Sequence, residues 1–423
     1  MRNDPLRGTA AIVFGCAAFA LLAWATSRST VDTTGKFMIA VTAVLLLSQL
    51  CGRAVRLAGQ PPVVGEVIGG LLLGPSVLGH FAPSVQEWLF PGPVKSAVQL
   101  TAQLGLVAFV FLLGWEQDVR DLRSSGRSVT IVGLACLVVP FGSGLLIGLP
   151  LLDSTPSALF LALALSITAL PVLARILHDL GMAEGRLGRL AIGAAVLDDA
   201  ICWAVLAAIL PFAGHGSRSP LMTLAAGAAL VAVLVFLVRP ALHAVLRSAP
   251  PSAVLTVAVA GALGTATITE MIGVHSILGA FLFGLVMPRR CVDREVTTQR
   301  IRGFTVAVLL PLFFAYVGMN TSLQSVAGQW WLLLLVLFAA VASKLVGGVV
   351  GGRLAGLDWR ESGTLGVLMN CRGLTELVVA NLGLSLGLID STMFAVLVLV
   401  ALGTTALTTP LLRLADRRQE VFV

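Results

Sequence analysis

The chain has 423 residues, of which 57% are hydrophobic and only 12% are charged. Because a soluble surface needs about a quarter of its residues charged, this composition excludes a soluble domain and indicates a polytopic membrane protein. The net charge of +7 does not indicate nucleic-acid binding, since basic residues collect in the cytoplasmic loops of membrane proteins. The six Cys are scattered singly, without a CxxC or Cys/His cluster, so the sequence indicates neither a disulfide framework nor a zinc site.

Apolar segments of spanning length run through the whole chain and predict an all-α polytopic membrane protein with 13–14 transmembrane helices. The first segment is either a retained extra helix or a signal sequence, because basic residues precede it and Ala23-Trp24-Ala25 resembles a cleavage site. The expected segments are 9–26, 37–55, 61–79, 94–114, 129–150, 157–177, 187–210, 220–238, 252–269, 271–287, 303–321, 330–352, 363–388 and 391–413.

Basic residues alternate between the loops. With the N-terminus inside, the inside loops hold 22 Arg or Lys and the outside loops hold 4. This asymmetry predicts that both termini are cytoplasmic. The few residues from 414 to 423 then form a short cytoplasmic tail, and we expect no attached nucleotide-binding or regulatory domain.

The chain also repeats itself. Segments 61–79, 94–114 and 157–177 resemble segments 271–287, 303–321 and 363–388, at offsets of roughly 203–210 residues. The partners lie seven spans apart, and because seven is odd they cross the membrane in opposite directions. One interpretation is chance similarity between Gly- and Leu-rich helices, but three pairs in order at nearly one offset favour an inverted-topology repeat, a design of secondary transporters with binding sites at the membrane midplane.

Segment 187–210 carries two adjacent carboxylates, Asp198 and Asp199, at its midpoint. A charge at this depth is costly and usually marks an ion or proton path. Neighbouring residues on a helix point about 100° apart, so the two carboxylates are expected to have different surroundings and roles.

Two other segments contain breaks. Pro171 interrupts segment 157–177, with the hydroxyl of Thr168 nearby, and Asn370, Arg372 and Gly373 interrupt segment 363–388. Broken helices in matching repeats offer carbonyl groups and helix dipoles to an ion at the midplane.

Three further charged residues lie in apolar segments. Lys344 either snorkels to the membrane surface or forms a salt bridge with a carboxylate of segment 187–210. Arg372 and Glu376 are spaced to pair with each other on one helix. The alternative is that Glu376 or Glu66 tunes the access of ions.

Four motifs occur in order along the chain. They are the Gly-Glu helix from Pro62 to Gly79, the Asp198-Asp199 pair, the intramembrane Lys344 and the stretch from Met369 to Leu377. In these motifs and their order, the chain resembles the monovalent cation:proton antiporters over about residues 37–413, and within that family the Kef-type and plant cation/proton exchanger branch.

The resemblance implies a sodium/proton antiporter fold with two crossed broken helices, and an antiporter that exchanges Na⁺ or K⁺ for protons by alternating access. It implies that Asp199 carries the cation and the proton in turn, that Asp198 pairs with Lys344, and that Thr168 and Pro171 lie near the ion. An Asp-Asp pair further implies electrogenic exchange.

The resemblance also implies a homodimer in the inner (plasma) membrane, with lipid as its surroundings and no cofactor. The expected organisation is an extra N-terminal helix or signal sequence (1–36), dimerisation parts 37–114 and 252–321, core transport parts 129–210 and 330–413, a linker helix (220–238) and the tail (414–423).

Other functions remain open at this point. A proton-uncoupled cation channel or sensor on the same fold, or a carrier of a small organic ion, would suit the apolar segments. An enzyme is not expected, because the sequence shows no nucleophile–base pair and no metal triad. The choice between Na⁺ and K⁺ depends on cavity size and oxygen placement, which sequence does not settle.

Overall fold

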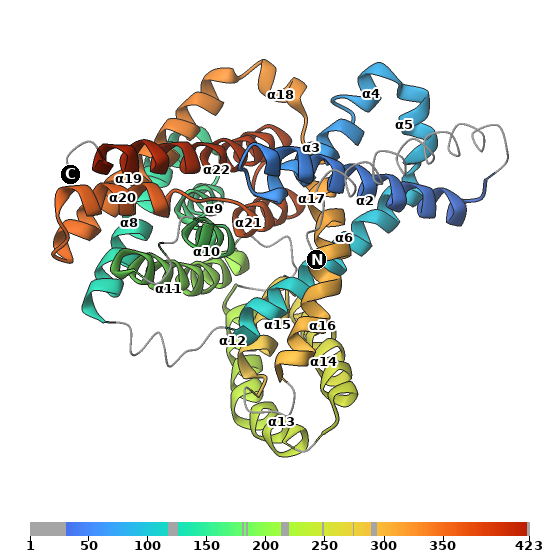
Figure 1. The fold of residues 1–423 in the computed structure, drawn as a ribbon. Coiled ribbons are helices and arrows are strands. Elements are labelled where there is room, and N and C mark those ends of the chain that lie inside the picture. Colours follow the sequence, from blue (N-terminus) through green and yellow to red (C-terminus); the bar gives the residue numbers. More distant parts are fainter. Residues whose placement is uncertain are drawn as a thin grey trace, which may run out of the picture. The chain divides into compact units, whose positions relative to one another are not determined.

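The computed structural model describes residues 31–116, 126–179, 182, 185–212, 220–247, 249–273, 275–288 and 294–420 (Figure 1). Within these ranges the chain is helical and no strand occurs, as an apolar chain in a bilayer requires, because each helix satisfies its own backbone groups. The expected all-α class is therefore confirmed. The expected segment 9–26 lies outside the described residues.

In the first part of the chain, α2 (Thr33–Leu57) and α3 (Pro62–Leu73) pack against each other, and two short helices lead into a long one. Gly65 lets α2 and α3 approach closely, because a Cβ at this position would overlap the backbone of Cys51. The elements that follow α3 are α4 (Leu78–Phe81), α5 (Pro83–Leu89), α6 (Gly92–Glu116), α8 (Arg127–Leu151), α9 (Thr155–Ser166), α10 (Leu170–Asp179) and α11 (Arg186–Ile209).

The part of the chain that follows α11 is also helical where it is described. A short 3₁₀ turn, η1 (Leu210–Phe212), follows α11, and two π-helical segments, η2 (Leu234–Val238) and η3 (Thr305–Leu309), interrupt long helices. The remaining elements are α12 (Pro220–Val233), α13 (Arg239–Leu246), α14 (Pro251–Ile272), α15 (Ser276–Val286), α16 (Arg294–Phe304), α17 (Leu310–Met319), α18 (Leu323–Ala327), α19 (Trp330–Leu354), α20 (Trp359–Met369), α21 (Leu374–Ser385) and α22 (Ser391–Glu420).

Ten helical stretches in the described part of the chain are long and apolar enough to cross a membrane. The expected segments 157–177 and 363–388 are absent from this group because each is broken into two short helices, α9 with α10 and α20 with α21. Segment 271–287 is shorter than expected, since its first residues belong to α14 and only α15 remains.

The described chain divides into two compact units. Unit 1 contains residues up to Glu116, Leu230–Ile268 and Gly279–Gln324, and unit 2 contains the intervening parts and the C-terminal part from Ser325. In unit 1, a core of small and branched side chains joins α2 and α6 to α17, for example Val44, Val98 and Leu312.

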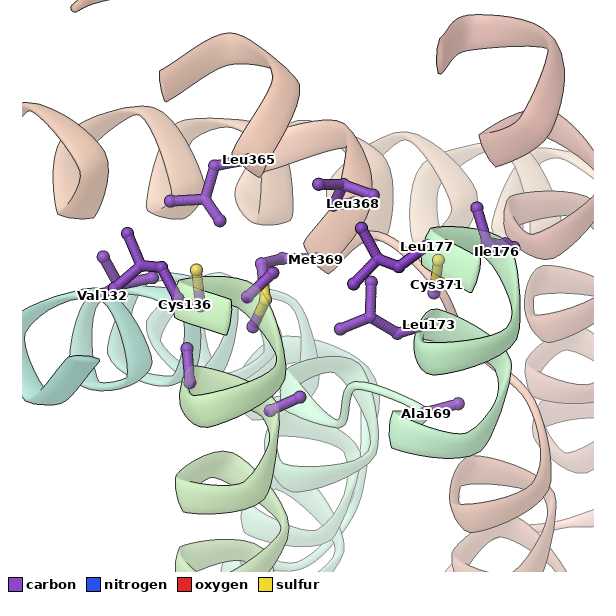
Figure 2. Packing of buried hydrophobic residues seen from close by; sticks show 14 of the residues in the cluster. Val132, Cys136, Ala169, Leu173, Ile176, Leu177, Leu365, Leu368, Met369 and Cys371 are labelled. Carbon is purple, nitrogen blue, oxygen red and sulfur yellow. The ribbon is translucent and has the colours of Figure 1, made fainter. Parts of the chain in front are cut away.

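Unit 2 has its own core, which lies around the two breaks. Buried apolar residues of α8, α10, α11 and α20 meet there, including Ala195 of α11. Figure 2 shows Val132, Leu173 and Leu365 of this core. The start of α20 is set locally by a capping box, in which Asp358 Oδ1 accepts the Glu361 N–H at 2.7 Å and Glu361 Oε2 accepts the Asp358 N–H.

Candidate functional site

The two helix breaks of unit 2 touch each other directly. The backbone N–H of Ala169, in the first break, donates to the Cys371 carbonyl in the second at 2.9 Å. The hydroxyl of Thr168 lies 3.4 Å from the Met369 carbonyl, which it reaches as a donor. Residues about 200 positions apart, from the two expected repeats, therefore meet at one point.

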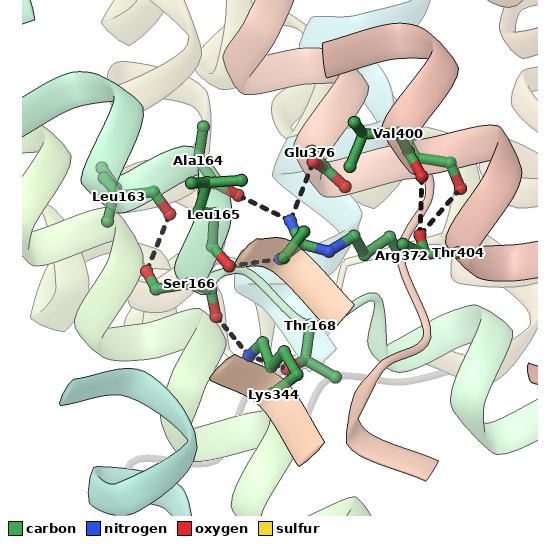
Figure 3. Close-up of polar contacts among 12 residues, drawn as sticks. Leu163, Ala164, Leu165, Ser166, Thr168, Lys344, Arg372, Glu376, Val400 and Thr404 are labelled. Carbon is green, nitrogen blue, oxygen red and sulfur yellow. Dashed lines mark hydrogen bonds and ion pairs between the residues drawn. The ribbon is translucent and has the colours of Figure 1, made fainter. Parts of the chain in front are cut away.

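The backbone carbonyls at the end of α9 have no donors within the helix, and two cationic side chains donate hydrogen bonds to them. Arg372 donates to the carbonyl of Ala164 at 3.1 Å and also to that of Leu165 (Figure 3). Lys344 donates to the carbonyl of Ser166. Positive charge at the C-terminal end of a helix also complements its dipole, so the break in α9 is stabilised by both side chains.

Lys344 lies in α19 and its side chain is fully buried. Its ammonium group also donates to the hydroxyl of Thr168 at 2.7 Å and to the carbonyl of Cys136 at 3.0 Å. Pro140 lies four residues after Cys136 inside α8, and because proline has no N–H, the Cys136 carbonyl is free to accept from Lys344. A fully buried ammonium does not fit the alternative in which Lys344 snorkels to the surface.

The two adjacent carboxylates of α11 have different surroundings. Asp198 Oδ2 lies 3.3 Å from Lys344 Nζ in a fully buried salt bridge, and its Oδ1 lies 4.0 Å from the thiol of Cys202. Asp199 is 2% exposed, and its Oδ1 has no hydrogen-bond partner among the described residues. One carboxylate is thus paired with a cation, while the other retains an oxygen without a partner.

A second buried ion pair lies beside the second break. Arg372 Nη1 lies 2.8 Å from Glu376 Oε1, and both side chains are fully buried. The expectation that both residues lie on one helix is wrong, because Arg372 stands in the break and Glu376 lies in the first turn of α21. The pair forms because the guanidinium turns back to the start of α21 while also holding the end of α9.

The other expected site residues are distributed as follows. Asn370 follows α20 directly and is fully buried, and neither its amide oxygen nor its amide nitrogen has a partner in the described part of the chain. Gly373 immediately precedes α21, and Pro171 is the second residue of α10. Glu66 lies in α3, which belongs to unit 1 and not to the unit of the two breaks.

Three contributors to the site were not expected from the sequence. They are the Ser166 carbonyl, the Cys136 carbonyl and Pro140, which leaves that carbonyl available. A backbone acceptor has no side-chain signature. The signal that was present is a proline in the interior of segment 129–150, because such a proline frees the carbonyl four residues before it.

The arrangement offers one buried carboxylate oxygen, on Asp199, to a proton or a cation. Among the described residues, no group of three or more His, Cys, Asp and Glu is arranged to hold a metal cofactor. A buried carboxylate without a counter-charge is strongly unfavourable until it binds a proton or a cation. Asp199 is such a group, and the nearby Asp198–Lys344 pair already balances its own charge.

The sequence of this chain is similar to those of known antiporters. The chain is 34% identical over 390 residues to Cation/H(+) antiporter 15 of Arabidopsis thaliana, an alignment that covers 89% of this chain and 47% of that protein. It is also 34% identical over 399 residues to the Na(+)/H(+) antiporter NhaS4 of Synechocystis, with 90% and 97% covered. The chain thus spans about half the length of the plant relative and nearly all of the cyanobacterial one.

The fold matches as well. The solved structure of the sodium proton antiporter MjNhaP1 from Methanocaldococcus jannaschii superposes with a TM-score of 0.66 at 17% identity, covering 90% of this chain and 97% of that one. Residues 39–414 match the family described as "Sodium/hydrogen exchanger, transmembrane". The resemblance and the fold class inferred from the sequence are confirmed, and this multi-pass membrane protein belongs to the transmembrane sodium/hydrogen exchanger family, whose members are secondary transporters and not enzymes.

Proposed function

We propose that the protein is a secondary active antiporter that exchanges a monovalent cation, Na⁺ or K⁺, for protons by alternating access. The observation that carries this proposal is the unequal pair on α11. Asp199 is buried with an unpartnered oxygen, whereas its neighbour Asp198 has Lys344 at 3.3 Å. Asp199 is therefore the group whose charge must be balanced by the cargo.

The mechanism is competition for one carboxylate. Ionised Asp199 attracts a cation with the help of neighbouring oxygens, and a proton on the same carboxylate removes that attraction and releases the cation. Asp198 and Lys344 form a balanced pair beside it. Because the two carboxylates are adjacent in the sequence, we expect them to exchange protons as a coupled set. When the carboxylate is exposed to the two sides of the membrane in turn, a proton gradient drives cation movement.

The names of the relatives support the class of cargo. The plant relative is named a cation/H(+) antiporter and the cyanobacterial relative a Na(+)/H(+) antiporter. We extend from them only the exchange of a monovalent cation for protons. Transport of Na⁺, of K⁺ or of both is compatible with the proposal, and the Asp-Asp pair favours electrogenic exchange.

The proposal also covers the membrane, the orientation and the oligomeric state of the protein. We place it in the plasma membrane with both termini in the cytoplasm, in keeping with the distribution of basic residues. We also propose a homodimer, with parts 37–114 and 252–321 forming the dimerisation domain, 220–238 a linker helix, and parts 129–210 and 330–413 forming the core that carries the ion.

A flux assay tests the exchange reaction. The purified chain is reconstituted into acid-loaded vesicles with a pH-sensitive dye, and Na⁺, K⁺, Li⁺ or Rb⁺ is added with and without a potential clamp. Cation-dependent proton efflux is the expected result, and its response to the clamp gives the electrogenicity. Cation flux that is independent of the proton gradient would contradict the proposal and favour a channel.

A further inference from the structure

Asn370 presents an unusual buried amide at the break between α20 and α21. Its side chain is fully buried, and both its oxygen and its nitrogen lack a hydrogen-bond partner among the described residues. An amide has two donor hydrogens and an acceptor oxygen with two lone pairs, so leaving both ends unsatisfied in the interior is costly. Such a group requires a partner that is not part of the described chain.

Asn370 lies between two residues that share a buried cluster with the helix that carries Asp199. The residues on either side of Asn370 are Met369 and Cys371, which Figure 2 shows in the buried cluster of unit 2. Ala195 of α11 belongs to the same cluster. Asp199 lies four residues after Ala195, one helical turn further on the same stripe of α11. The stripe of α11 that leads to Asp199 and the residues that flank Asn370 are therefore parts of one buried cluster.

The charges of the site favour a neutral ligand at this place. Lys344 balances Asp198, and Arg372 balances Glu376, which leaves the charge of Asp199 for the cargo. A monovalent cation on Asp199 makes the cluster neutral, so its remaining ligands should be uncharged oxygens. The hydroxyl of Thr168 already accepts a hydrogen bond from Lys344 at 2.7 Å, whereas the amide oxygen of Asn370 is unoccupied.

We propose that the side-chain oxygen of Asn370 is a direct ligand of the cation carried by Asp199, and that it helps to determine which monovalent cation is transported. This inference rests on the proposed antiport function. The cation would then link α11 to the second helix break, so that both expected repeats contribute to one ion site.

The test compares Asn370→Ala with a matched control, Ser362→Ala. Ser362 lies on the same helix α20, and its hydroxyl is likewise fully buried and without a partner in the described residues. Loss of one ligand to a charged ion is expected to raise the half-saturating cation concentration about tenfold. The ratio of Na⁺ to K⁺ transport should change in Asn370→Ala, and Ser362→Ala should retain both properties.

A second variant and a second measurement keep the inference testable if Asn370→Ala does not fold. Asn370→Asp keeps the shape and one oxygen but adds charge, so it should bind cations with a changed Na⁺/K⁺ preference. Thermal unfolding of the full chain in detergent with NaCl, KCl or choline chloride measures binding without transport. Cation-dependent stabilisation is expected for the unmodified chain and for Asn370→Asp, and a smaller stabilisation for Asn370→Ala.

These experiments distinguish failure of the proposed function from failure of the ligand role of Asn370. If the unmodified chain shows no cation-dependent proton flux, the proposed function is overturned and the ligand role falls with it. If the unmodified chain exchanges cations but the Asn370 variants keep its half-saturating concentration and its Na⁺/K⁺ ratio, the ligand role alone is overturned.

Discussion

Lys344 illustrates how a single buried charge is accommodated at membrane depth. Its ammonium has acceptors on α8, the end of α9, the first break and α11, of which Asp198 alone is charged. Two of the acceptors are backbone carbonyls that lack helical donors, one because α9 ends and one because Pro140 has no N–H. The ammonium of Lys344 is therefore stabilised by carbonyls that are freed in two helices, as well as by the carboxylate of Asp198.

Replacing Lys344 by Ala should destabilise the protein and change the electrical signature of exchange, instead of simply blocking transport. The reason is that Asp198 would be left as a buried carboxylate without its cation, which typically costs about 3–5 kcal/mol. Thermal unfolding and the response of proton flux to a potential clamp measure the two effects.

Two further variants sharpen this prediction. Lys95 is exposed in α6, so Lys95→Ala should leave both properties unchanged. The double variant Asp198→Asn with Lys344→Ala removes both charges and should regain part of the lost stability. Normal stability together with an unchanged electrical signature in Lys344→Ala would show that the pair has no such role.

The charged side chains of the site could be predicted from the sequence, whereas its backbone acceptors could not. Charged residues in apolar segments are conspicuous, so Asp198, Asp199 and Lys344 could be selected from the sequence alone. The carbonyls of Cys136 and Ser166 could not, because an acceptor on the backbone becomes available only when a particular helix turn is broken. Asn370 was selected only as support for a break, since its missing partners are a property of the folded chain.

At the scale of the elements, close packing of α19 against α20 positions the lysine. Gly348 lies one turn after Lys344, and a Cβ at Gly348 would overlap the backbone of Gly366. Close approach of backbones at small residues is a general means of joining helices in membranes, where burial of apolar surface adds little.

Gly348→Ala should therefore lower both thermal stability and exchange rate. Overpacking of a tight contact typically costs about 1–3 kcal/mol, and separation of the two helices would also displace Lys344. The matched control is Gly363→Ala in α20, where an added Cβ meets nothing within 4 Å. Equal effects of the two substitutions on the melting temperature would contradict the importance of this contact.

The helices themselves were largely predictable, because bilayer thickness fixes the length of an apolar segment. Each expected segment from 37–55 onward corresponds to helical structure in the described residues. What the apolar pattern could not give is the position at which a span breaks. The end of α9 at Ser166 depends on Arg372 and Lys344, which come from distant parts of the chain.

At the scale of the whole molecule, the charges of the loops predict the orientation of the protein in the membrane. Unit 2 contains a cavity of about 530 Å³ lined by the end of α8, the start of α19 and the loop between α21 and α22. Asp153 and Asp390 both line it. From the charge asymmetry of the loops, we predict that these helix ends face the outside of the cell.

Labelling from the two sides of the membrane tests this orientation. In a background without the native cysteines, Asp153→Cys should react with a membrane-impermeant maleimide added outside intact cells. Arg360 is also exposed, but it lies beyond the opposite end of α19, which we predict to face the cytoplasm. Arg360→Cys should therefore react only after the membrane is permeabilised. Reaction of both positions from the same side would contradict the predicted topology.

The central claim is that Asp199 carries the cation and the proton in turn, and its replacement by Asn tests that claim most directly. Asn keeps the size of the side chain but cannot be ionised, so Asp199→Asn should abolish cation-dependent proton flux in proteoliposomes. Asp153→Asn, which changes an exposed carboxylate of the same unit, should leave the flux intact. Substantial cation-dependent proton flux remaining in Asp199→Asn would contradict the account.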